Sequence, residues 1–228
     1  MPVRTDRFGV VGVITLDRAQ RANAYDDALL DGLDDALAIS CAVLVVQSEG
    51  EGAFCAGADL DGLRKALPLD ALSLRSQAVF TRLARHPSIT IAAIQGPAIA
   101  GGLELALACD FRVAGPGARF AFPETALGIL PSAGGTTRLA RIIGVPRAKE
   151  MILTGRALDG RTALDWGLVN RLADGPRAEA LAWGGEIARR DHAALALAKE
   201  LFNMDESAAS LSAERVAEAI LYGRRPAS

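Results

Sequence analysis

The sequence predicts an α/β core followed by a smaller helical layer. Residues 42–47 and 89–95 are short apolar runs of strand length, as expected in a sheet covered on both faces. Segments with helical periodicity alternate with such runs in the first part of the chain, and helical patterns dominate after residue 134. With 228 residues, half of them hydrophobic, the chain can bury one sizeable core.

The first half of the chain carries the clearest alternation. Residues 10–16 are β-branched and apolar and form the first expected strand. Leu29, Leu33 and Leu37 recur at helical spacing, so a helix is expected over residues 26–39, with Asp26 or Asp27 as its N-cap. A glycine-rich loop at 49–59 follows the strand at 42–47, and a helical region is expected over 69–85 before a break at Pro87.

The second half begins with short elements and continues as helices. Gly101 and Gly102 open a short helix, and short strands at 111–114 and 119–122 flank a Gly-Pro-Gly turn. Further helices are expected over residues 135–143, 146–153, 160–166, 176–190, 193–202 and 207–222. No repeat in the 20–50-residue range of solenoids is visible.

Composition excludes several classes of function. A net charge of −2 gives no global field for nucleic acid or an anionic membrane. The three cysteines are far apart, without a CxxC pair, which argues against a disulfide framework or a zinc site and fits a reducing compartment. The most apolar region, 89–111, is too interrupted for a membrane span, and residues 1–9 carry charges in place of the apolar run of a signal peptide. We therefore expect a cytoplasmic protein without membrane or nucleic-acid partners.

The segment 54–60 is the first candidate for function. Ala56, Gly57 and Ala58 are small, so a ligand could approach the backbone closely; a simple tight loop explains the same pattern. Cys55 is a weak candidate nucleophile, because nothing in the sequence places His86 or His192 beside it.

Glu104 is unusual because it lies in an otherwise apolar helix. Its neighbours three and four positions away, among them Ala100 and Leu107, cannot pair with a charge. A buried carboxylate without a partner is costly or has a raised pKa, which favours acid–base chemistry. The alternative is that Glu104 points into solvent.

Glu124 is the second candidate acid–base group. It follows a proline in an apolar stretch, and Arg119 and Arg138 are the nearest cations in the sequence. A salt bridge to one of these arginines is the alternative. Residues 131–135 form a second small-residue turn that opens a helix.

The segment 54–60 and the stretches around Glu104 and Glu124, in this order, resemble the crotonase (enoyl-CoA hydratase/isomerase) superfamily. The resemblance extends over about residues 10–172. The resemblance implies a crotonase-like spiral core of repeated strand-strand-helix turns. It assigns 1–165 to this core and 166–228 to a C-terminal helical oligomerisation region that is short relative to the family. A homotrimer or a dimer of trimers is expected.

The resemblance also implies a reaction. The substrate would be an acyl-CoA thioester, coenzyme A would be part of that substrate, and no separate cofactor or metal is expected. The thioester oxygen would lie in an oxyanion hole made by the backbone N–H groups of Ala58 and Gly101. Glu104 would orient and deprotonate the attacking water, and Glu124 would hold that water and deliver a proton to the α-carbon.

Having both glutamates favours hydration over isomerisation, because isomerases of the family can use a single carboxylate at the position of Glu124. An isomerase, a specialised acyl-CoA dehydratase, a thioester hydrolase and a degenerate scaffolding subunit remain alternatives. Residues expected to contact the substrate are Arg18, Arg21, Ala24, Ala56, Gly57, Asp59, Leu60 and Ser132.

Three positions depart from the pattern of the family. Ala100 and Ser132 stand where hydratases commonly have glycine, and Asp61 replaces a lysine that often approaches the CoA phosphates. Arg18 and Arg21 are therefore the first candidates to hold these phosphates, and Arg64 and Lys65 are the next. The alternative is that all four are ordinary surface charges.

Overall fold

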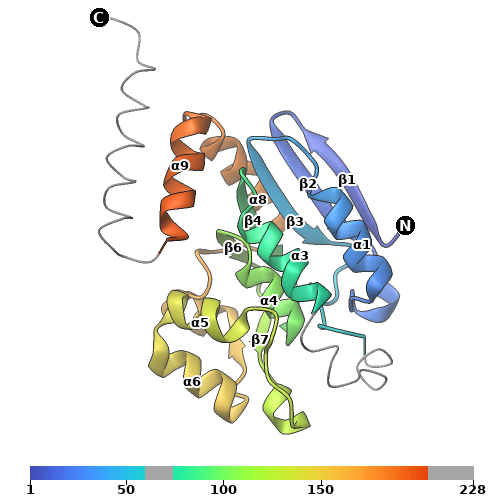
Figure 1. Cartoon of the computed structure of the whole chain (residues 1–228), viewed down its shortest axis with the longest axis vertical. Coiled ribbons are helices and arrows are strands. Elements are labelled where there is room, and N and C mark those ends of the chain that lie inside the picture. The colour runs from blue at the N-terminus through green and yellow to red at the C-terminus, as the bar shows by residue number, and fades with distance from the viewer. Residues whose placement is uncertain (60–73, 205–228) are drawn as a thin grey trace, which may run out of the picture.

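The computed structural model describes residues 1–59 and 74–204 (Figure 1). Within them, the main sheet has six strands in the order β1-β2-β3-β4-β6-β9, and a smaller sheet has the order β5-β7-β8. The strands are β1 Val3–Phe8, β2 Val11–Leu16, β3 Val43–Ser48, β4 Ile89–Ile94, β5 Ala98–Ile99, β6 Phe111–Ala114, β7 Arg119–Ala121, β8 Leu158–Asp159 and β9 Arg171–Leu172. The helices are α1 Asp27–Ala36, α3 Arg75–Ala84, α4 Gly101–Leu107, α5 Gly135–Ile143, α6 Val145–Thr154, α7 Gly160–Asp165, α8 Pro176–Ile187 and α9 His192–Phe202, with 3₁₀ helices η1 Ala19–Arg21 and η3 Glu124–Leu127.

The main sheet is parallel from β2 to β9, and β1 pairs antiparallel with β2 at its edge. Every residue of β2 and β4 is buried, as the continuous apolar runs predict for a sheet covered on both faces. Asp26 caps α1 by accepting a hydrogen bond from the N–H of Leu29. The predicted α/β class is confirmed.

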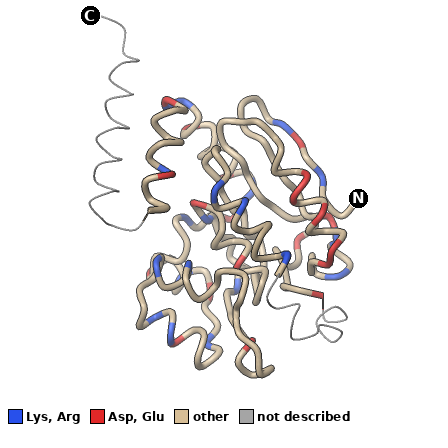
Figure 2. The backbone as a smooth tube through the Cα atoms, viewed as in Figure 1, with Lys and Arg blue, Asp and Glu red and all other residues tan. Residues whose placement is uncertain are grey.

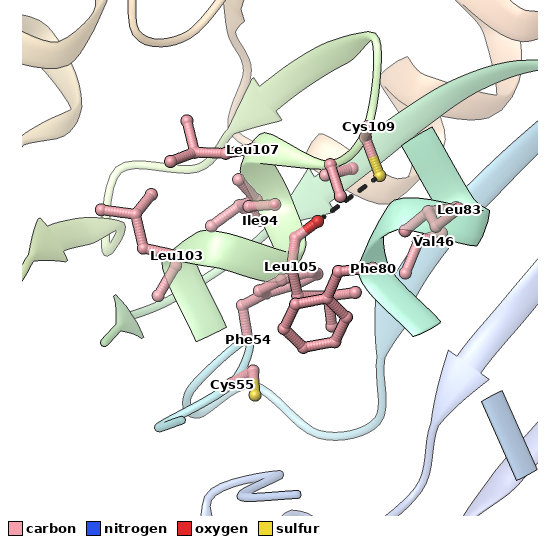
Figure 3. Packing of buried hydrophobic residues seen from close by; sticks show 14 of the residues in the cluster. Val46, Phe54, Cys55, Phe80, Leu83, Ile94, Leu103, Leu105, Leu107 and Cys109 are labelled. Atoms are coloured by element: carbon pink, nitrogen blue, oxygen red, sulfur yellow. Dashed lines mark hydrogen bonds between the residues drawn. The ribbon is translucent and has the colours of Figure 1, made fainter. Parts of the chain in front are cut away.

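Two hydrophobic clusters lie on opposite faces of the main sheet. Val13, Val45 and Ile91 pack on one face together with Ala180 of α8. Ile14, Val46 and Ile94 belong to the cluster of the other face, which α1, α3 and α4 complete. Figure 3 shows the centre of this second cluster, where Phe80 of α3 meets Leu105 of α4. The helix α4 therefore packs against a cluster of fully buried side chains.

The sequence reasoning missed the shortest and the most polar strands. In β1 only Val3 is buried, so no apolar pattern marks this edge strand. β5, β8 and β9 have two residues each, too few for a periodic signal. Of the helix expected over 69–85, α3 accounts for Arg75–Ala84, and residues 69–73 and the helix expected over 207–222 lie outside the described residues.

The segment after residue 165 is joined closely to the core. β9 pairs with β6 in the main sheet, and α8 packs against β3, β4 and β6. The division predicted at residue 165 and the oligomerisation role of the helices after it stay predictions.

Charges of both signs are interspersed along the chain (Figure 2). None of the helices in the described part of the chain combines the length and the apolar character that crossing a bilayer requires. Residues 1–59 and 74–204 also hold no group of three or more His, Cys, Asp or Glu side chains placed to bind a metal ion.

Candidate active site

Glu104 lies inside the protein, with its side chain fixed by the start of another helix. The residue is only 3% exposed, so it does not point into solvent. Its Oε1 accepts hydrogen bonds from the N–H groups of Ala133 (2.7 Å) and Gly135 (2.8 Å) at the beginning of α5. Burial raises the pKa of Glu104 above its ordinary value, and these two N–H groups and the charge of Arg138 oppose the rise.

Only one oxygen of the Glu104 carboxylate is used in this way. Among the described residues, no protein donor bonds to Oε2. The carboxylate is therefore rigidly oriented through Oε1 and keeps Oε2 for another partner.

Glu124 opens η3 and is 6% exposed. Within the described residues, its Oε2 is buried without a hydrogen-bond partner. Burial raises the pKa of Glu124 to about 7; its own backbone N–H opposes this, and the charge of Glu104 adds to it. The charge of Glu104 contributes to this rise, so Glu104 lies within electrostatic range of Glu124.

The arginines nearest in sequence do not neutralise Glu124. Arg119 donates to the carbonyl of Ala118, and Arg138 donates to the carbonyl of Ala133 and to Thr81. The salt-bridge interpretation of Glu124 is therefore wrong for the described residues. A buried carboxyl without a cationic partner is a good proton donor near neutral pH.

The loop around residue 58 is held by short backbone pairings. The N–H of Tyr25 donates to the carbonyl of Gly57, and the N–H of Asp59 donates to the carbonyl of Tyr25, each at 2.8 Å. Successive N–H groups of an extended chain point to opposite sides, so the N–H of Ala58 points away from Tyr25. Among the described residues, this N–H has no acceptor.

The same loop runs beside the start of α4. The N–H of Cys55 donates to the carbonyl of Pro97 (3.3 Å), and the N–H of Ile99 donates to the carbonyl of Cys55 (3.0 Å). A Cβ at Gly57 would lie 3.2 Å from the N atom of Gly101. Gly101 begins α4, and no acceptor for its N–H occurs in the described part of the chain. Two unpaired backbone donors thus come from neighbouring segments.

Ala100, the residue directly before Gly101, has a strained backbone conformation. Its φ of 53° and ψ of −128° are normally adopted by glycine. Such strain costs on the order of 1–3 kcal/mol and persists only where the surroundings enforce it. Here the N–H of Ala100 donates to Ala121, while its carbonyl accepts from Leu103 and Glu104.

The expected substrate-contact residues lie in two places. Arg18 pairs with Asp26 (2.9 Å) and Asp59 (3.1 Å), and Arg21 pairs with Asp59 (3.4 Å). The N–H of Ala56 donates to the carbonyl of Ala22, so the loop at 18–24, which includes Ala24, lies beside the loop at 55–59. The guanidinium of Arg18 is largely engaged by carboxylates, whereas the Arg21 side chain is 54% exposed.

Ser132 lies in a different place from these loops. It is exposed on the turn before α5, next to Ala133, and its carbonyl accepts a hydrogen bond from Gln77. Leu60 and Asp61 lie outside the described residues, as do Arg64 and Lys65. The role of all these residues in substrate binding stays a prediction.

Cys55 is fully buried, and burial raises the pKa of its thiol to about 12. A neutral thiol without access is a poor nucleophile. Cys55 acts through its backbone, which joins the loop to β5.

Sequence reasoning missed three residues of the site. Ala133 and Gly135 act through backbone N–H groups that carry no side-chain signal. Tyr25 falls between the polar loop and the first helix; its ring is buried against Phe80 at 5.6 Å. A lone aromatic residue at a loop–helix junction was its only signal.

The family model of enoyl-CoA hydratase/isomerase matches residues 7–227 of this sequence. The chain belongs to this family. The resemblance seen in the sequence and the crotonase-like fold are thereby confirmed.

Relatives in the family are similar over most of the chain. A probable enoyl-CoA hydratase of Mycobacterium tuberculosis is 37% identical over 232 residues, with 98% of this chain and 87% of that protein aligned. The crystal structure of an enoyl-CoA hydratase from Bacillus anthracis superposes with a TM-score of 0.91 at 34% identity, over 96% of this chain and 90% of that one.

A third relative is much longer than the part it shares. The probable mitochondrial enoyl-CoA hydratase 2 of Arabidopsis thaliana is 43% identical over 166 residues, which cover 69% of this chain and 54% of the plant protein. The chain thus matches about half the length of this relative.

Proposed function

We propose that this member of the family is an enoyl-CoA hydratase that adds water to the double bond of a trans-2-enoyl-CoA. The observation that carries the proposal is the pair of buried carboxyl groups with different environments. Glu104 is held by two N–H groups, and Glu124 has a pKa of about 7 and an oxygen without a partner in the described residues. A base and an acid are thereby provided at one place.

The reaction uses these groups together. Oε2 of Glu104 takes a proton from water as the water oxygen bonds to the β-carbon of the substrate. The electrons of the double bond move toward the thioester, whose oxygen becomes negative and accepts from the N–H groups of Ala58 and Gly101. Glu124 gives its proton to the α-carbon, so that H and OH have added on the same face. The proton on Glu104 then returns to Glu124, directly or through water.

The backbone donors supply a large share of the stabilisation in this scheme. Loss of one oxyanion donor typically costs ~3–4 kcal/mol of transition-state stabilisation. Both donors are fixed in the protein before substrate arrives, because Tyr25 holds the segment of Ala58 and α4 begins at Gly101.

The biological setting is part of the proposal. The substrate class points to fatty acid or related acyl-CoA metabolism. We expect a homotrimer or a dimer of trimers in the cytoplasm, with the acyl-CoA as the partner. The names of two relatives place them in mitochondria, which is a statement about those proteins.

The carboxylates are tested by Glu104→Gln and Glu124→Gln, each assayed with crotonyl-CoA by loss of the conjugated absorbance. Each variant should hydrate at least ~10²-fold more slowly, because a general acid or base is removed. In Glu104→Gln, the amide oxygen that replaces Oε1 can still accept from Ala133 and Gly135, so the fold is preserved. Glu200→Gln, on the exposed surface of α9, is the matched control.

Two results would redirect the proposal. Near-normal turnover in either variant removes that residue from the mechanism. If hydration is absent throughout, in the wild type as well as in the variants, and only Glu124→Gln loses activity on a 3-enoyl-CoA, the protein is an isomerase. The pH profile adds a signature: wild-type hydration should fall as pH rises through about 7, where Glu124 loses its proton, and fall again in acid as Glu104 gains one.

A further inference from the structure

Tyr25 contacts both residues that supply the unpaired backbone donors. Its own N–H and carbonyl bond to Gly57 and Asp59, the two neighbours of Ala58. At the other end of the side chain, a Cβ added to Gly101 would overlap the Tyr25 hydroxyl oxygen. One residue therefore spans the distance between the two donor segments.

The position of the hydroxyl is fixed by packing. The Tyr25 ring is only 9% exposed and meets the ring of Phe80 edge to face, with centroids 5.6 Å apart and an interplanar angle of 89°. Because Phe80 belongs to the buried cluster shown in Figure 3, the ring has little freedom to move. Gly101 leaves the space of a missing Cβ, and the hydroxyl oxygen occupies it.

The surroundings of the hydroxyl are polar on one side. Ser76 of α3, itself only 7% exposed, acts on it and lowers the pKa of Tyr25. The titratable groups that act on it are Glu104, Cys55 and Glu124; burial and these groups raise the pKa of Tyr25. The side chain consequently stays a neutral O–H group that can donate a hydrogen bond.

We propose that Tyr25 is a positioning residue that sets the separation and the direction of the N–H groups of Ala58 and Gly101. The inference rests on the proposed function, because the proposed reaction gives these donors a thioester oxygen to bind. The backbone of Tyr25 fixes Ala58, and its hydroxyl fixes the first residue of α4. Loss of the hydroxyl leaves a gap beside Gly101 into which the start of the helix can move.

Tyr25→Phe is the direct test, because it removes one oxygen and keeps the ring. The probe is a chromophoric cinnamoyl-type thioester of coenzyme A, whose absorbance shifts to the red when its carbonyl is polarised. Bound to Tyr25→Phe, it should show a smaller red shift than with the wild type. With crotonyl-CoA, kcat should fall about tenfold while KM stays within about twofold, since donors displaced by a fraction of an ångström act on the transition state.

Leu83→Ala is the matched control. Leu83 lies on the same helix and in the same buried cluster as Phe80 and belongs to neither donor segment, so its truncation should lower the melting temperature and leave the red shift and kcat near those of the wild type. A Tyr25→Phe variant with the wild-type red shift and kcat overturns the inference. So does a Leu83→Ala variant that loses as much red shift as Tyr25→Phe, because both would then report packing alone.

The experiment separates this inference from the proposed function. A wild type that shifts the probe but does not hydrate refutes the hydratase proposal, and Tyr25 is then judged by the red shift alone. A wild type that binds the probe without any red shift refutes the oxyanion role of Ala58 and Gly101, and the inference falls with it.

Discussion

Glu124 illustrates how a single buried group can favour chemistry at the expense of stability. Its ordinary pKa is 4.5, and burial raises it to about 7 in the folded protein. Between these values the folded state binds more protons than the unfolded state, so stability falls as pH rises from 4.5 to about 7. Above that range the ionised carboxylate stays buried, and its Oε2 has no partner among the described residues.

Glu124→Gln should therefore be more stable than the wild type in alkaline conditions. A neutral amide has no charge to desolvate, so its melting temperature should exceed that of the wild type at about pH 8, and the difference should shrink toward about pH 5. Thermal unfolding followed by circular dichroism across this range measures it. A difference that stays constant with pH would show that ionisation of Glu124 does not carry the cost.

The sequence could identify the two carboxylates but not their surroundings. Glu104 stood out because no charged residue lies one helical turn away, and Glu124 because it follows a proline in an apolar stretch. The groups that orient Glu104 are backbone N–H groups 29 and 31 residues further along the chain. Such partners are set by tertiary contacts, and the amino-acid types along the chain do not reveal them.

At the scale of the elements, the start of α5 is what holds Glu104. Its N-cap, Gly134, has no side chain to accept from the first N–H groups of the helix, and the carboxylate of α4 accepts in its place. α4 and α5 are thus joined by the side chain proposed to activate water. Both helices were predictable from the sequence, whereas this connection between them was not.

Gly135→Ala should displace the carboxylate of Glu104 from the N–H groups at the start of α5. A Cβ there would lie 2.9 Å from Oε1 of Glu104 and 2.7 Å from Cβ of Pro131, so the carboxylate must shift. A displacement near 1 Å at a reacting group costs about 10²-fold in kcat, and KM should change little. Steady-state kinetics on crotonyl-CoA measures this change.

Gly185→Ala serves as its control, because a Cβ at Gly185 of α8 meets nothing within 4 Å. It should leave kcat unchanged and stabilise the helix slightly. Normal turnover in Gly135→Ala would show that the position of Glu104 does not depend on α5.

At the scale of the whole molecule, large apolar side chains stand exposed on neighbouring elements. Leu127 of η3 and Leu153 of α6 are 64% and 68% exposed, and Leu130, which follows η3, is 61% exposed. η3 packs against α6, where Thr125 donates to the carbonyl of Ile152 (3.1 Å). Apolar side chains gathered on the surface are typical of an interface between proteins.

We therefore expect a homo-oligomer at micromolar concentration. Light scattering should give about three or six times the mass of one chain, as the trimer and the dimer of trimers require. Leu127→Asp together with Leu153→Asp should reduce that mass if these side chains lie in the interface. A wild type that scatters as a stable monomer would contradict the expected assembly.

The strand order of the main sheet also has a consequence for biosynthesis. β1, β2, β3, β4, β6 and β9 lie side by side in the order in which they are translated, so each new strand can add at the edge left by the one before it. Translation proceeds at about 5–20 residues per second. Glu104 leaves the ribosome with α4, but Ala133 and Gly135 follow 29 and 31 residues later, a delay on the order of seconds. The carboxylate proposed to activate water is thus enclosed only after most of the sheet that supports it has been made.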